Sequence, residues 1–92
     1  MSMDDVYERA QIAERELEHF NGRLRESFSE VMRSHDAVSP IWDDAMRREY
    51  DISWRPLQES MEEYINLIGP QYVDFLIERL RYLQAYLYGH GA

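Results

Sequence analysis

The first third of the chain carries an uninterrupted helical repeat, and this repeat constrains the fold more than any other feature. From Met3 to His35 there is no proline and a single glycine. Apolar residues recur every three or four positions, a mean of about 3.6, which is the period of a helix with one apolar face. Ser2, with Asp5 three residues later, is typical of a helix start. The repeat comprises Val6, Ala10, Ala13, Leu17, Phe20, Leu24, Phe28 and Val31.

A helix over about 3–35 would be ~50 Å long, so it needs a partner helix of similar length to cover its apolar face. Residues 40–68 supply one. Ser39 is the expected N-cap, and Pro40 occupies the first helical position, where its missing N–H costs nothing. The apolar register continues across Pro56, which favours a kinked helix over a break. The sequence therefore predicts an antiparallel helical hairpin.

A third apolar helix is expected over about 70–88. Gly69 followed by Pro70 predicts a helix stop, although the pattern leaves open whether the third helix folds back or continues the second. This segment is apolar nearly all round, so one intramolecular groove cannot cover it. We expect an all-α single domain over 1–92, a bundle completed by homodimerisation. The expected interface residues are Tyr72, Phe75, Leu76, Leu80, Leu83, Tyr86 and Leu87.

The composition excludes several classes of function. The formal net charge is −8, from 18 acidic and 10 basic residues, which argues against nucleic acid or an anionic membrane as partner. No apolar run approaches the length that spans a bilayer, so membrane insertion is not expected. There is no cysteine, which excludes disulfides and thiol chemistry. No signal peptide pattern opens the chain, so we expect a cytoplasmic protein or one exported without a cleavable signal.

The sequence offers little to support catalysis or metal binding. Glu16 and His19 form one Glu-x-x-His pair, whereas di-iron bundles use two such pairs with further carboxylates. The histidines at 19, 35 and 90 are scattered, and there is no nucleophile elbow and no glycine-rich phosphate loop. We therefore expect a non-enzymatic protein with no metal and no cofactor.

Aromatic residues gather near the start of the second predicted helix. Trp42, Tyr50 and Trp54 fall at spacings of 8 and 4, on one side of a helix. We expect these residues to pack at the turn of the hairpin and not to stack on a ligand, because a stripe at helical spacing is the usual mark of a packed face. The arginines of this region are expected to pair with acids four residues earlier, Asp43 with Arg47 and Asp44 with Arg48.

The segment Ser39-Pro-Ile-Trp42-Asp-Asp, with Tyr50 eight residues after the tryptophan, resembles the turn of the Trp-x-Gly (WXG-type) helical hairpins of type VII secretion. The resemblance covers about residues 3–68. It implies a hairpin that pairs into a four-helix bundle and acts as a secreted substrate, partner or adaptor. Asp44 stands where the family has its glycine, and no tyrosine is followed four residues later by an acid.

Two functions follow as hypotheses. The first is a helical interaction protein, a WXG-like secretion substrate, partner or adaptor, that pairs with itself or with a related helical protein. The alternative is an acidic antitoxin, immunity protein or chaperone that masks a basic protein, since a charge of −8 would accelerate such an encounter.

Overall fold

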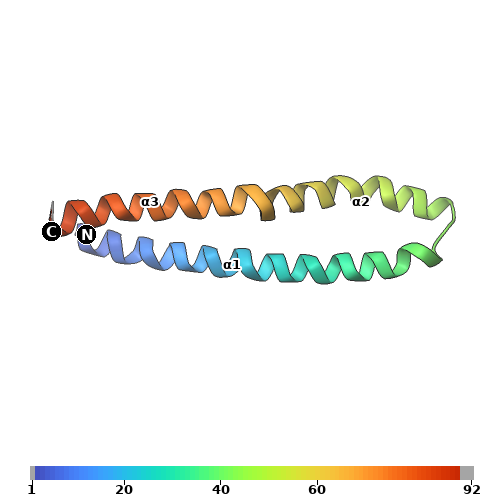
Figure 1. Cartoon of the computed structure of the whole chain (residues 1–92), viewed down its shortest axis with the longest axis horizontal. Helices are drawn as coiled ribbons and strands as arrows, with labels where there is room; N and C mark the ends of the chain where they lie inside the picture. The colour runs from blue at the N-terminus through green and yellow to red at the C-terminus, as the bar shows by residue number, and fades with distance from the viewer. Residues whose placement is uncertain (1, 90–92) are drawn as a thin grey trace.

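The computed structural model describes residues 2–89 and shows two long helical arms that lie antiparallel (Figure 1). The first arm is α1 (Met3–Val38), followed by the short 3₁₀ turn η1 (Ser39–Ile41). The second arm consists of α2 (Ala45–Glu63), the π-helical turn η2 (Tyr64–Ile68) and α3 (Gly69–Tyr88). The molecule measures 65 × 24 × 16 Å. The all-α hairpin predicted from the sequence is thus confirmed. His90 lies outside the described residues.

The start of α1 agrees with its sequence signal, but the start of the second arm does not. The Ser2 side chain accepts a hydrogen bond from the Asp5 N–H at 3.2 Å. Ser39 was expected to cap a helix at Pro40, yet its own N–H donates to the His35 carbonyl and so closes α1. The cap of α2 is Asp44, whose side chain accepts a hydrogen bond from the Arg47 N–H. The second helix therefore begins at Ala45 instead of 40.

The predicted helix stop at Gly69 is wrong. Gly69 has right-handed helical dihedrals (φ −58°, ψ −54°), and its N–H donates to the Tyr64 carbonyl five residues earlier. In a regular α-helix the Pro70 ring would collide with the carbonyl of Asn66, and the wider π turn relieves that crowding. The third predicted helix is therefore a continuation of the second arm, not a separate element that folds back. α2 also runs through Pro56 without a break.

The two arms enclose only a thin core. Among residues 2–89, the buried apolar side chains are Ile65 and Val73, each 8% exposed. The inner line of α1 differs from the predicted apolar repeat, because Ala13, Phe20 and Val31 are exposed. The line instead repeats every seven residues, the period of a supercoiled pair of helices, and includes polar positions. Its seven-residue series is Tyr7, Glu14, Asn21, Phe28 and His35, all buried or half-buried.

Candidate interaction surfaces

The residues of α3 predicted to form an interface fall on two different faces. Val73 is buried against α1, and the leucines that share its helical face are half-buried. The inner group is Leu76, Leu80, Leu83 and Leu87. The outer group is Tyr72, Phe75 and Tyr86, which are 56%, 46% and 69% exposed. The hairpin itself therefore buries the leucines against α1, while the aromatic residues stay largely exposed.

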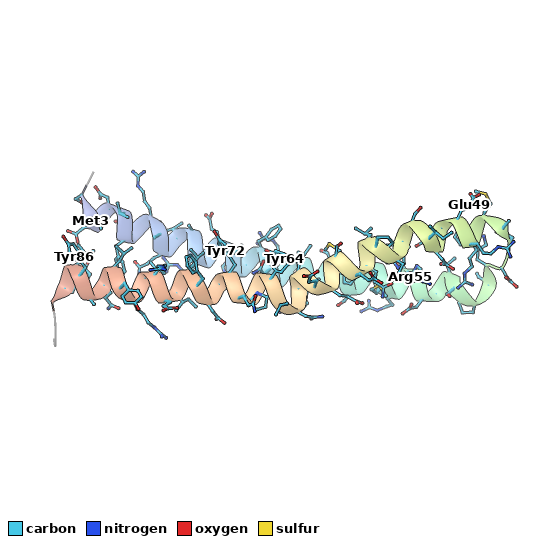
Figure 2. All side chains as sticks on the ribbon, turned by 90° about the horizontal axis from the view of Figure 1, so that it is seen from above. Met3, Glu49, Arg55, Tyr64, Tyr72 and Tyr86 are labelled. Carbon is cyan, nitrogen blue, oxygen red and sulfur yellow. The ribbon has the colours of Figure 1, made fainter. Side chains whose placement is uncertain are left out.

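The outer aromatic residues belong to a continuous line along α3, which we call the α3 stripe. Its successive spacings of 3, 4, 3 and 4 residues are those of a coiled-coil seam. Figure 2 shows side chains along the outer sides of the arms as well as between them, with Tyr72 and Tyr86 labelled on α3. The α3 stripe consists of Tyr72, Phe75, Arg79, Tyr82 and Tyr86.

Arg79 lies within this stripe and does not interrupt it. Its guanidinium carbon is 5.1 Å from the Phe75 ring centroid and 5.8 Å from that of Tyr82. A guanidinium over an aromatic face is attracted by the ring quadrupole and is more weakly hydrated than an ammonium. The Tyr72 and Phe75 rings add a tilted contact at 5.9 Å. From Tyr72 to Tyr82 the stripe is thus a connected aromatic surface with one stacked cation.

The second arm carries its charge unevenly. Residues 69–89 contain two acids, Asp74 and Glu78, and two arginines, Arg79 and Arg81, so this segment is neutral although the chain is at −8. Self-repulsion is therefore low at α3, since the excess acid lies elsewhere.

An aromatic cluster occupies the turn end of the hairpin. The His35 ring of α1 stacks on Trp54 at 4.8 Å and on Tyr50 at 5.5 Å between centroids. Its Nδ1 is 2.9 Å from the Tyr50 hydroxyl oxygen. Trp42 packs on Tyr50 at 5.2 Å. The three aromatic residues singled out in the sequence therefore meet one another, and His35 joins them to α1.

Arg47 ties down the connection between the arms. Its guanidinium donates to the Ser39 carbonyl, to the Ser39 hydroxyl at 2.5 Å and to the Trp42 carbonyl at 2.7 Å. Its Nε lies 3.4 Å from Asp51, the one ion pair within 4.0 Å among residues 2–89. The predicted pairs with preceding acids are therefore wrong, because Asp44 acts as the helix cap and accepts from the Arg47 N–H and the Trp42 indole, each at 3.0 Å.

A pocket of about 620 Å³ opens beside this cluster. Aromatic and aliphatic side chains form much of its wall, and Glu30 and Asp51 are its acidic lining residues. The lining residues are Ser27, Glu30, Val31, Ser34, His35, Val38, Ser39, Trp42, Arg47, Tyr50 and Asp51.

Polar side chains also cross the middle of the hairpin. The Tyr64 hydroxyl donates to Asn21 Oδ1 at 2.7 Å, which links the π turn to α1. A Cβ on Gly69 would lie 3.1 Å from Asn21 Nδ2 and 3.1 Å from the Tyr64 carbonyl oxygen, so glycine permits this close approach. The apolar periodicity of α1 does not indicate Asn21, because its side chain is polar.

Glu14 is the most deeply buried charged residue of the hairpin, 6% exposed. Burial raises the pKa of its carboxyl, and the neighbouring Glu18 raises it further by a hydrogen bond and by charge. Its Oε1 atom has no hydrogen-bond partner. A buried acid on the inner line lowers the free energy of unfolding. In the sequence, only the interval of seven residues between Tyr7 and Glu14 could have indicated that Glu14 is buried.

The described residues offer no assembled metal site. Among residues 2–89, no three His, Asp or Glu side chains lie close enough to hold a metal ion. Glu16 and His19 are both exposed on α1. In the same part of the chain, no helix combines the length and the apolar character needed to cross a bilayer.

Comparison with known proteins adds no assignment. No family model, curated protein or solved structure matches this chain.

Proposed function

We propose that this protein is a non-enzymatic helical interaction protein that works as an oligomer. The observation that carries the proposal is that the hairpin buries few apolar side chains between its arms, while the aromatic residues of the α3 stripe stay exposed. Soluble monomers rarely leave contiguous apolar surface uncovered, and such surface marks a protein contact. A hairpin whose outer side continues the coiled-coil spacing is suited to pairing with a second helical hairpin as a four-helix bundle.

A second copy of the same chain is the favoured partner. Homodimers with two-fold symmetry are the commonest assemblies, and the neutral charge of residues 69–89 allows two copies to approach through this face. Tyrosines suit such a contact, because their rings bury apolar area while their hydroxyl groups reach water.

The WXG-like layout supports a role in secretion as substrate, partner or adaptor. Trp42 lies in the connection between two long antiparallel arms, which is the position of the turn tryptophan in that family. In a host that has a type VII secretion system, the protein should appear in the medium, and deletion of the secretion ATPase of that system should abolish its appearance. Unchanged export in that strain would contradict this part of the proposal.

Light scattering tests self-association directly. Wild-type protein at micromolar concentration should have twice the chain mass of 11.1 kDa. Tyr72→Glu should halve the mass while the helical circular dichroism persists, because Tyr72 is 56% exposed and has no role in the hairpin core. Arg81→Glu, a substitution at an exposed position outside the α3 stripe, is the matched control and should stay dimeric. A folded wild-type monomer across this range would refute the proposal.

The pocket at the turn end favours a second function, the masking of a basic protein. Its aromatic wall and the Glu30 carboxylate would suit an arginine or lysine side chain of the partner. Titration with acetyl-arginine amide should quench the tryptophan fluorescence, whereas the neutral analogue acetyl-citrulline amide should not. Glu30→Gln should weaken the arginine response, and equal responses to both compounds would rule out this second function.

A further inference from the structure

The α3 stripe reads nearly the same in both directions. Arg79 is its centre, with an aromatic residue three or four positions away on either side, Phe75 and Tyr82. Seven positions away on either side is a tyrosine, Tyr72 and Tyr86. The symmetry concerns both spacing and side-chain type. The inner line of Val73 and the leucines has the same spacing symmetry, but it is turned toward α1, so only the outer line is free to pair with another helix.

Such a pattern has a geometrical meaning in a dimer. Across a two-fold axis, residue i of one copy meets residue j of the other, and j meets i. When two helices cross antiparallel over Arg79, each Tyr72 therefore meets a Tyr86, and each Phe75 meets a Tyr82. A parallel arrangement would instead align each residue with its own copy and would make no use of the reversal symmetry.

The antiparallel contact brings like charges together at one position of the stripe, Arg79. The segment around the stripe is neutral, so the two helices do not repel one another as a whole. The exception is Arg79, where two cations approach the axis. Each guanidinium lies over the rings of its own Phe75 and Tyr82, and the attraction of the ring quadrupoles offsets part of the repulsion between the two cations.

We infer that α3 of one copy packs antiparallel on α3 of a second copy, with the two-fold axis passing at Arg79. The inference rests on the self-association proposed above and specifies its geometry. The contact forms a seam of four aromatic pairs with the arginines at its middle, on the side of α3 that Val73 and the inner leucines leave free. The bundle then has the two α3 helices at the dimer contact.

Cysteine cross-linking tests this geometry cleanly, because the chain contains no cysteine of its own. Arg79→Cys places the two thiols at the axis, and it also removes the like charges that meet there. Tyr72→Cys alone places them about 21 Å apart, given 14 residues at 1.5 Å rise between 72 and its symmetry partner 86. A disulfide needs Cα atoms about 4.4–6.8 Å apart, so this variant should not cross-link with itself.

After oxidation with diamide, non-reducing electrophoresis should show a covalent dimer for Arg79→Cys. A mixture of Tyr72→Cys and Tyr86→Cys should also give a dimer, whereas neither variant alone should do so. Arg81→Cys, which is exposed away from the stripe, serves as the control for random collision. Each variant is first checked for helical circular dichroism, so a failure to fold is recognised.

The outcomes separate the geometry from the function. Efficient self-linking of Tyr72→Cys would show a parallel contact and overturn the inference. A wild-type dimer by light scattering with no Arg79→Cys link above the Arg81→Cys control would overturn the antiparallel geometry but leave self-association standing. A wild-type monomer would overturn both.

Discussion

Replacement of Glu14 by leucine should make the hairpin markedly more stable. Glu14 is 6% exposed, carries an unpartnered Oε1 atom and has a raised pKa because of its burial. Complete burial of a leucine side chain contributes about 1.5–3 kcal/mol, and the helix propensities of Leu and Glu are similar. We therefore expect a gain of about 2 kcal/mol in the free energy of unfolding, which corresponds to a melting temperature about 10 °C higher for a domain of this size.

The stability that Glu14→Leu adds should be larger at neutral pH than in acid. Because the pKa of the Glu14 carboxyl in the folded chain lies above its ordinary value of 4.5, the folded chain binds the proton more tightly than the unfolded chain. The penalty from Glu14 is therefore fully present above the folded pKa and fades as the pH falls toward 4.5. The stability difference between Glu14→Leu and wild type should thus be larger at pH 7.5 than at pH 4.5.

Urea denaturation at both pH values, at one protein concentration, measures this difference. Glu16→Leu is the matched control, since Glu16 is exposed on the same helix and its replacement should change the unfolding midpoint little. A Glu14→Leu protein no more stable than wild type, or a stability gap that does not narrow in acid, would refute the reasoning about burial.

Three further substitutions test other parts of the hairpin. Trp54→Ala removes the ring that stacks on His35 and should lower the free energy of unfolding by about 2 kcal/mol, less than for a fully buried tryptophan, which thermal melts would show. Tyr64→Phe removes the hydrogen bond to Asn21 and should cost about 1 kcal/mol in urea denaturation, and no change would mean that water replaces the bond. Asp44→Ala removes the cap of α2 and should cost about 1 kcal/mol with reduced helical circular dichroism, whereas Asp43→Ala should not.

The helical hairpin could be predicted from the sequence because each arm carries its own signals. The apolar periodicity and the capping residues of one arm can be recognised without knowing where the other arm lies. The Ser2 cap is one such local signal. Gly69 and Pro70 misled the prediction, because a glycine that ends a helix and a glycine that permits close approach look alike in one sequence. Only the position of Asn21 on the opposite arm distinguishes the two, and that position becomes known when the arms are aligned.

The inner line of α1 was harder to predict for a related reason. A 3.6-residue repeat and a 3.5-residue repeat differ by about 20° per heptad, so over five turns they select different residues. The apolar repeat selected Phe20, while the supercoiled arms bury its neighbour Asn21. The sequence predicted one set of interface residues on α3, because it could not separate the exposed aromatic residues from the leucines that face α1.

The connection held by Arg47 also determines the order in which contacts between the two arms should form during folding. The contact between His35 and Tyr50 closes a segment of 15 residues, whereas the contact between Tyr7 and Tyr88 closes nearly the whole chain. Loop-closure entropy alone makes the near contact easier by about 1.5 kcal/mol. The hairpin should therefore zip from the Arg47 connection toward the termini and fray in reverse, so that the α3 stripe, close to the open end, is completed last.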